Sequence, residues 1–321
     1  MGRKRGEMSK RIACVGVGNI GRAWAAIFAR AGHEVALYDE APEALQEALP
    51  AIAGNLAAMA EAGLAEDADA AVACIRVCDS LAEALDGANY VQESVFEDIE
   101  VKRAMFRTLD HEAPPGAIIA SSVSSLPPSE FMANLAGGAR CIVTHPTNPP
   151  SLIPVIEVML GPATNEETYE RTCALLEGAG QIPVRLNKEI FGYVLNRLQF
   201  ALINEALHLV EGGYVSAEDA DKIVKHGLGR RWAFMGPFET NHLNATGGIA
   251  EYYDKFAGAI GGILADLKTE PNALKPGLIA RIAEEMEATT PVAEVPAKQQ
   301  WRDKQLTALW RHFEEMKHGA K

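Results

Sequence analysis

The sequence predicts an α/β fold, with a doubly wound and mostly parallel sheet, followed by an all-helical domain. Three features of its 321 residues indicate this class. Short apolar runs alternate with helical segments as far as residue 187, which is typical of a parallel sheet with helices on both faces. A glycine-rich turn joins the first apolar run to the first helical segment. Residues 188–321 contain no convincing strand pattern, and a chain of this length is expected to form two domains.

The elements of the first half follow from its hydrophobic pattern. Short apolar runs predict strands over residues 11–17, 34–39, 75–78, 90–93, 117–121, 140–145, 155–159 and, more weakly, 182–185. Helical spacing of apolar residues predicts helices over residues 20–31, 43–62, 101–112 and 166–179. The alanine-rich stretch 56–74 also reads as helix.

The second half is predicted to be helical throughout. Residues 191–211 keep helical spacing of leucines, Gly212 and Gly213 end that helix, and Ser216 starts the next one. Further helices are predicted over residues 248–267, 276–288 and 298–317. The predicted organisation is therefore a disordered tail over residues 1–10, a sheet domain over 11–187 and a helical domain over 188–321.

The composition excludes several classes of partner. Asp and Glu number 43 against 30 Lys and Arg, a formal net charge of −13. Such an acidic chain is not expected to bind nucleic acid or an anionic membrane surface through bulk charge. No apolar stretch approaches the roughly 18 residues of a membrane span. The sequence shows neither such a span nor a secretory signal, so we expect a cytoplasmic protein. The five cysteines are widely spaced and suggest neither a disulfide framework nor a metal site.

The strongest motif is the glycine-rich turn that contains Gly16, Gly18 and Gly21. It follows a predicted strand and opens a predicted helix, the arrangement of a Rossmann-type dinucleotide site. Gly16 permits the tight turn, Gly18 lets the backbone approach a diphosphate, and Gly21 lets the helix lie close to the strand. Asn19 and Ile20 begin the helix, where unpaired N–H groups favour an anion.

Asp39 ends the second predicted strand, 18 residues beyond Gly21. Its carboxylate can accept hydrogen bonds from ribose hydroxyls and would repel a 2′-phosphate. No cation follows it in Glu40, Ala41 and Pro42. The predicted cofactor is therefore NAD in preference to NADP.

A second group of polar residues follows other predicted strands. His145 ends one strand, and a proline-rich loop must return the chain through residues 155–159, which carry Glu157 back beside it. A histidine paired with a carboxylate can act as a general base. Ser124 follows another strand end, and Asn196 lies with Arg197 inside an apolar helix. Each feature also has a structural explanation: an ordinary His–Glu contact, a helix-capping serine, or a polar pair at a domain interface.

Taken together, these segments resemble the 3-hydroxyacyl-CoA dehydrogenase superfamily over nearly the whole chain. Within it the sequence is most similar to the lambda-crystallin branch, which acts on the free sugar acid L-gulonate. The matching segments are residues 16–21, 124–126, 145–150, 157, 187–197, 227–237, 242–245 and 300–303.

The resemblance implies roles for particular residues. His145 would be the general base, Glu157 its orienting partner, and Ser124 and Asn196 the groups that bond the reacting oxygen. Asp39, Glu97, Lys102 and Asn148 would join the glycine turn in holding NAD. The helical domain would bind substrate and form a homodimer.

The substrate remains open among several classes. A free 3-hydroxy acid is one, with oxidation of L-gulonate to 3-dehydro-L-gulonate as the leading example. A 3-hydroxyacyl-CoA is another, but residues 41–75 hold no Lys, Arg or His, so that surface would repel CoA phosphates. Arg231 suits a single substrate carboxylate, or else an interface salt bridge. Its surroundings also resemble carnitine dehydrogenase, and a non-catalytic crystallin-like protein is a further alternative.

Overall fold

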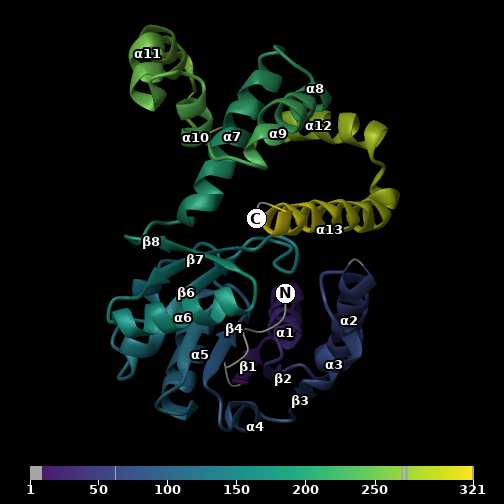
Figure 1. Ribbon diagram of the computed structural model, residues 1–321, viewed down its shortest axis with the longest axis vertical. Helices are drawn as coiled ribbons and strands as arrows, with labels where there is room; N and C mark the ends of the chain where they lie inside the picture. The colour runs from purple at the N-terminus through teal and green to yellow at the C-terminus, as the bar shows by residue number, and fades with distance from the viewer. Residues whose placement is uncertain (1–8, 62, 269, 272–273, 320–321) are drawn as a thin grey trace. The chain divides into compact units, whose positions relative to one another are not determined.

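The computed structural model describes residues 9–61, 63–268, 270–271 and 274–319 (Figure 1). The chain divides by its internal contacts into two compact units. One comprises Met1–Leu195 together with Trp301–Lys321, and the other comprises Asn196–Gln300. Apart from Ser9 and Lys10, the predicted tail over residues 1–10 lies outside the described residues.

The first unit is built on an eight-stranded sheet, which confirms the predicted fold class. The strands are β1 (Arg11–Val15), β2 (Glu34–Tyr38), β3 (Ile75–Val77), β4 (Tyr90–Glu93), β5 (Ile118–Ser121), β6 (Cys141–Pro146), β7 (Val155–Leu160) and β8 (Ile182–Leu186). Their order is β3-β2-β1-β4-β5-β6-β7-β8. Neighbours are parallel except β6 and β7, which are antiparallel. The first six strands have the Rossmann order, in which ligands bind at the carboxyl ends near β1 and β4.

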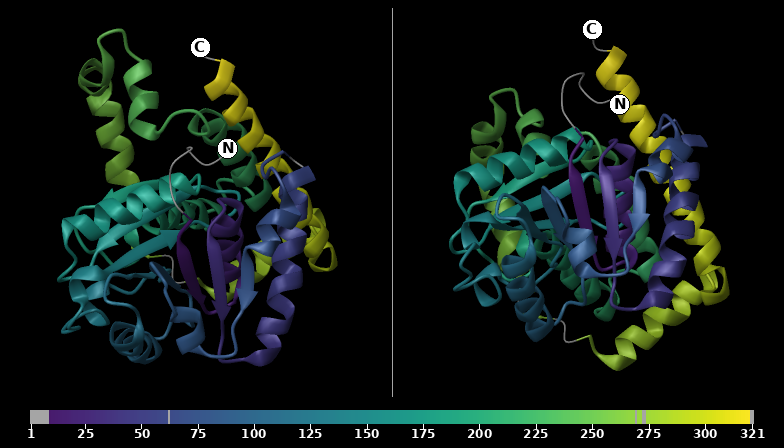
Figure 2. Two further views of the ribbon diagram at one scale, coloured as in Figure 1. Left: turned by 60° about the horizontal axis from the view of Figure 1, so that its bottom comes forward. Right: turned by 90° about the horizontal axis from the view of Figure 1, so that it is seen from below.

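Helices cover both faces of this sheet (Figure 2). They are α1 (Asn19–Arg30), α2 (Pro42–Glu61), α3 (Ala68–Ala73), α4 (Leu81–Leu85), α5 (Ile99–Glu112) and α6 (Glu166–Gly178). Successive strand side chains point to opposite faces. In β1, Ile12 and Cys14 therefore join the core with α1, α2, α3 and α6. Ala13 and Val15 join the core on the other face, with α4 and α5.

The alanine-rich stretch 56–74 is not one helix, contrary to the prediction. Helix α2 ends at Glu61, and α3 begins at Ala68. Gly63 has a φ of +75°, a left-handed conformation that ends a helix. Asp67 then caps α3 by accepting the N–H of Ala70 at 2.9 Å. Alanine favours helix on both sides, but the glycine and the aspartate set the break.

The second unit is helical, as predicted. Its helices are α7 (Tyr193–Glu211, from Asn196 onward), α8 (Ala217–Ile223), the π-helix η3 (Val224–Leu228), α9 (Gly229–Trp232), α10 (Pro237–Leu243), α11 (Gly248–Asp266) and α12 (Pro276–Thr289). Helix α7 begins two residues later than predicted because Gly192 and Tyr193 have φ values of +73° and +51°. Ser216 caps α8 as expected, accepting the N–H of Asp219. Within the described residues, no helix combines the length and apolar character needed to span a membrane.

The last helix, α13 (Val295–Gly319), connects the two units in sequence. Its residues from Trp301 onward belong to the first unit, where the guanidinium of Arg30 lies 4.8 Å from the ring centre of Trp310. This division differs from the predicted boundary at residue 187 with all of 188–321 in one domain. The hydrophobic pattern identifies α13 as a helix but does not show which unit it contacts.

Candidate active site

The candidate site residues of the first unit lie at one edge of the sheet. Loops follow the carboxyl ends of β1, β4, β5 and β6 there, and β7 starts there because it runs antiparallel to β6. These loops carry the glycine turn, Glu97, Ser124 and Asn148, while His145 and Glu157 belong to the strands themselves. The edge is the one at which doubly wound sheets bind ligands.

The glycine turn has room for a diphosphate. A Cβ on Gly16 would lie 2.7 Å from the backbone of Ser94, and one on Gly21 would lie 1.8 Å from the carbonyl oxygen of Gly16. These two glycines are therefore needed by the protein's own packing. Gly18 has an ordinary φ of −61°, and a Cβ there would meet nothing within 4 Å. The N-cap residue of α1 is Gly18, which has no side chain to cap the helix, so the first N–H groups of α1 are suited to bind an anion. The residues present fit NAD.

Asp39 holds the glycine turn in place. One carboxylate oxygen accepts the N–H of Val17 at 2.8 Å, and the other accepts the N–H of Ala41 at 2.9 Å. Each oxygen keeps a further acceptor position. Arg22, which is not among the predicted site residues, donates to the carbonyls of Val17 and Ala44. It thus links the turn to α2 and is already engaged.

His145 and Glu157 form a buried pair. They are register partners on β6 and β7, so their side chains lie on the same face of the sheet. The Nδ1 atom of His145 lies 2.8 Å from Oε2 of Glu157, and the two residues are 5% and 4% exposed. A carboxylate at Nδ1 fixes the tautomer with the proton on that nitrogen and leaves Nε2 as an acceptor. The predicted juxtaposition of these two side chains is present.

Glu157 has a second set of partners. Its Oε1 accepts the N–H groups of Val194 and Leu195, each at 2.9 Å, in the first turn of α7. Burial alone would raise the pKa of Glu157, but the bonds from His145 and from these two N–H groups outweigh it and lower the pKa. Glu157 therefore stays ionised beside the imidazole.

Glu97 joins the loops that follow β4 and β5. Its carboxylate accepts the N–H and the hydroxyl of Ser124, and also the N–H and the hydroxyl of Ser125. Burial tends to raise the pKa of Glu97, but these hydrogen bonds lower it below the ordinary value. The Ser124 hydroxyl is thus engaged by Glu97 in this structure.

Lys102 is buried below these loops. Its Nζ lies 2.6 Å from Oε1 of Glu93 and donates to the carbonyl of Val95 at 3.0 Å. The other oxygen of Glu93 accepts the hydroxyl of Ser121 at 2.7 Å. Lys102 is 1% exposed and Glu93 is fully buried. Glu93 was not singled out from the sequence, although a glutamate ending an apolar strand was a usable signal.

Three predicted site residues remain: Asn148, Asn196 and Arg231. Asn148 is exposed in the loop after β6. Asn196 follows Leu195 directly in α7 and is the first residue of the second unit. Arg231 lies in α9 of that unit and is exposed, and its guanidinium makes no ion pair within the described part of the chain. Among the described residues, no three His, Cys, Asp or Glu side chains are grouped as metal ligands would be.

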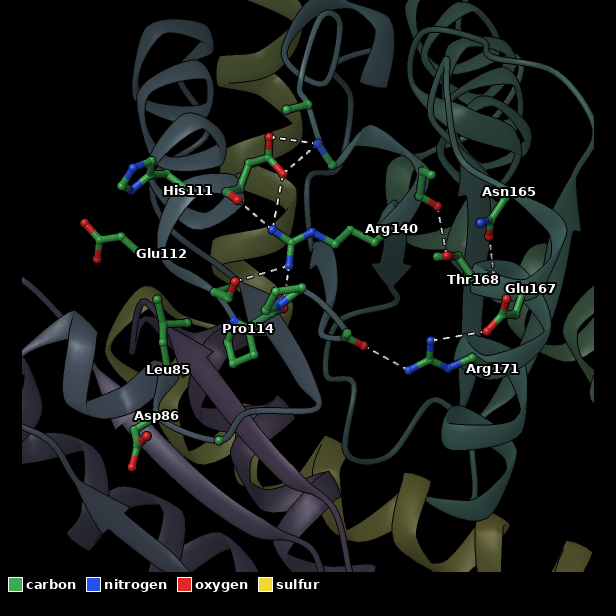
Figure 3. Close-up of a pocket in the computed structure, with 18 of the residues that line it drawn as sticks. Leu85, Asp86, His111, Glu112, Pro114, Arg140, Asn165, Glu167, Thr168 and Arg171 are labelled. Carbon is green, nitrogen blue, oxygen red and sulfur yellow. Dashed lines mark hydrogen bonds and ion pairs between the residues drawn. The ribbon is translucent and has the colours of Figure 1, made fainter.

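A cavity of about 1040 Å³ opens at the opposite edge of the sheet (Figure 3). The arginines that line this cavity donate hydrogen bonds to the protein's own backbone. Arg140 donates to the carbonyls of Asp110 and Pro114, and Arg171 donates to the carbonyl of Gly116. The cavity adjoins the amino-terminal ends of the strands, away from the predicted site residues of the first unit. We do not assign it to the reaction.

Comparison with known proteins places the chain in a family. Residues 11–190 match the family described as 3-hydroxyacyl-CoA dehydrogenase, NAD binding domain, and residues 192–268 match its C-terminal domain. Lambda-crystallin homologs of Mus musculus and Homo sapiens are 39% identical over 303 residues, covering 93% of this chain and 94% of each relative. An L-carnitine dehydrogenase of Streptomyces coelicolor is 38% identical over 251 residues, 78% of each chain.

A solved structure of an NAD+-dependent 5-formyl-3-hydroxy-2-methylpyridine 4-carboxylic acid 5-dehydrogenase has the same fold. It superposes with a TM-score of 0.83 at 29% identity, covering 96% of this chain and 99% of that one. The fold and the nucleotide turn define an oxidoreductase with NAD as its cofactor. The chain belongs to the 3-hydroxyacyl-CoA dehydrogenase family.

Proposed function

We propose that this chain oxidises the 3-hydroxyl of a free 3-hydroxy acid, with L-gulonate, converted to 3-dehydro-L-gulonate, as the first candidate. The dehydrogenase chemistry rests on the buried pair of His145 and Glu157, at the same end of the sheet as the nucleotide turn. The substrate class rests on one further observation, the absence of any basic residue from positions 41–75.

His145 is the proposed general base. NAD, when bound, supplies the acceptor for the hydride from the carbinol carbon. Nε2 of His145 takes the hydroxyl proton, and the positive imidazole is stabilised by the ionised Glu157 at Nδ1. Because Glu157 is also anchored by two backbone N–H groups, the ring has a fixed partner throughout the reaction.

Ser124 and Asn196 are proposed to bond the reacting oxygen. The Ser124 hydroxyl must exchange Glu97 for that oxygen, since it has one proton to donate. Asp39, Asn148, Glu97 and the glycine turn are proposed to hold NAD. Lys102 is proposed to act indirectly, because its ammonium group is buried against Glu93 and Val95 rather than lying at the surface of the site.

The charge of α2 and α3 favours a free acid over an acyl-CoA. The resemblance implies that acyl-CoA enzymes use basic residues after the second strand to meet CoA phosphates. Here that segment carries only acidic charges, at Glu43, Glu47, Glu61, Glu66, Asp67 and Asp69. Like charges repel the phosphates, so CoA binding at this surface is disfavoured.

Arg231 is the proposed partner of the substrate carboxylate. A guanidinium offers two parallel N–H donors that match a carboxylate. A free acid requires such a cation in a chain with a net charge of −13. The similarity to an L-carnitine dehydrogenase makes L-carnitine, also a 3-hydroxy acid, the second candidate substrate.

A homodimer through the helical unit is also proposed. Many large apolar side chains of residues 196–300 are more than half exposed: Leu198, Phe200, Ile223, Phe234, Phe238, Leu243, Ile263, Leu264, Leu274 and Val292. Apolar exposure on this scale marks a protein interface. Light scattering should give twice the chain mass of 34.5 kDa, whereas a single-chain mass would contradict the dimer.

All five cysteines are free, which supports a reducing, cytoplasmic location.

The proposed function is tested by following NADH formation with four substrates at equal concentration. They are L-gulonate, L-carnitine, 3-hydroxybutyrate and 3-hydroxybutyryl-CoA. A higher kcat/KM for a free acid than for the thioester supports the proposal. A higher kcat/KM for 3-hydroxybutyryl-CoA overturns the substrate class, and no NADH with any of the four contradicts the reaction.

A further inference from the structure

Tyr193 connects the parts of the site that carry the proposed base and the proposed hydroxyl donor. It begins helix α7, is fully buried, and has no role in the assignments above. Its ring touches His145, its hydroxyl bonds the loop that contains Ser124, and the residues after it bind Glu157.

The first contact restrains the imidazole. The ring centres of Tyr193 and His145 are 5.2 Å apart with 67° between the planes, an edge-to-face arrangement. The hydrogen bond from Nδ1 to Glu157 fixes one atom of the imidazole but leaves rotation about that bond. The ring of Tyr193 limits this rotation, so the two contacts together fix the direction of Nε2.

The second contact fixes the serine loop. The Tyr193 hydroxyl donates to the carbonyl of Leu126 at 2.8 Å, and the N–H of Gly192 donates to the carbonyl of Ser125 at 3.3 Å. Ser124 precedes both of these carbonyls in the same loop. Burial raises the pKa of the Tyr193 phenol, so it remains protonated and keeps donating at every working pH.

The backbone of Tyr193 supports the same arrangement. Its φ of +51° is uncommon for an aromatic residue and is held by the surrounding contacts. Directly after this left-handed residue, the N–H groups of Val194 and Leu195 meet Oε1 of Glu157. The side chain and the following backbone therefore reach both members of the His145–Glu157 pair.

We propose that Tyr193 is a positioning residue that sets the spacing between His145 and Ser124 and so aligns proton transfer from the substrate hydroxyl. This inference rests on the proposed function, in which His145 is the base. Tyr193 itself touches neither substrate nor cofactor in this account. Its effect passes through His145 and through the loop of residues 124–126.

Tyr193→Phe tests the inference because it keeps the ring and removes only the bond to Leu126. We expect kcat to fall about 10-fold through misalignment, with KM for NAD changed less than about twofold. The solvent isotope effect on kcat, measured in D2O against H2O, should rise because proton transfer becomes slower. Tyr193→Leu removes the ring as well and should lower kcat further.

Tyr90→Phe is the matched control. Tyr90 is 1% exposed, and its hydroxyl donates to Oε1 of Gln92 at 3.2 Å within the sheet core. Loss of that hydroxyl should lower thermal stability to a similar degree but leave kcat and the isotope effect unchanged. A merely structural role for Tyr193 would make Tyr193→Phe behave in the same way as Tyr90→Phe, which would overturn the inference.

A second readout does not depend on turnover. The ring-proton NMR resonances of His145 can be assigned as those missing from His145→Gln. We expect these resonances to shift in Tyr193→Phe and to stay in place in Tyr90→Phe. Because Tyr193→Phe keeps the aromatic ring beside His145, such a shift would report a change in the position of the imidazole. Unshifted resonances in Tyr193→Phe would overturn the inference. A wild-type protein without activity on any tested hydroxy acid would instead refute the proposed function, and the NMR comparison would still decide the role of Tyr193.

Discussion

Glu157 bonds Nδ1 of His145 through one carboxylate oxygen and receives the first turn of helix α7 on the other. The side chain proposed to orient the base thus also anchors the helix that continues to Asn196. These hydrogen bonds lower the pKa of Glu157, so the carboxylate stays ionised and can accept both contacts.

The lowered pKa of Glu157 predicts an acid-dependent loss of stability. A carboxyl group with a lower pKa in the folded protein stabilises the fold above its unfolded pKa, about 4.3 for glutamate. That contribution is lost as the pH falls from this value through the lower folded pKa. We expect the wild type to lose more stability than Glu157→Gln between pH 6 and pH 3, measured by urea unfolding. Parallel pH curves for the two proteins would argue against this role.

The glycine turn predicts different effects for two similar substitutions. Gly18→Ala places a methyl group in open space, so folding should be retained while NAD binding weakens. Gly21→Ala places it 1.8 Å from the carbonyl oxygen of Gly16, so the fold itself should suffer. Thermal unfolding and NAD titration of both variants check this expectation. Normal NAD affinity in Gly18→Ala would mean that the diphosphate does not approach this backbone.

The ion pair of Lys102 and Glu93 predicts a coupled effect on NAD affinity. Removal of one partner of a buried pair costs about 3–5 kcal/mol, because it leaves an uncompensated charge. Lys102→Met and Glu93→Gln should each disturb the loops that we propose to hold NAD, and the double variant should recover much of the affinity for NAD. If Lys102 instead contacts NAD directly, the double variant will bind NAD as weakly as Lys102→Met does. Calorimetric titration with NAD separates the two cases.

The fold was predictable from local pattern, but the connections within the site were not. Short apolar runs located the eight strands, and the signal was plainest for central strands such as β4 and β5, which are buried on both faces. Strand order also brought Glu157 beside His145. The contacts of the second carboxylate oxygen of Glu157 and the burial of Lys102 depend on side-chain directions, which the sequence pattern does not specify. The break at Gly63 was missed because alanine favours helix on either side of it.

Arg231 predicts selectivity for a free carboxylate. Hydrogen bonds to charged groups are worth about 1.5–3 kcal/mol, so Arg231→Ala should lower kcat/KM for a free hydroxy acid by about 10- to 100-fold. Arg231→Lys should recover only part, because an ammonium group lacks the planar fork. Arg230→Ala is the matched control, since Arg230 is an exposed neighbour on the same helix. Equal effects of Arg230→Ala and Arg231→Ala would exclude a specific carboxylate contact.

The most direct test of the account compares wild type with His145→Gln in two measurements on one preparation. These are NADH formation with L-gulonate and NAD affinity by titration. We expect the variant to bind NAD as the wild type does and to lose about 10²- to 10⁴-fold in kcat, the usual contribution of a positioned base. A variant that keeps the wild-type kcat would contradict the assignment of His145, and with it the proposed mechanism.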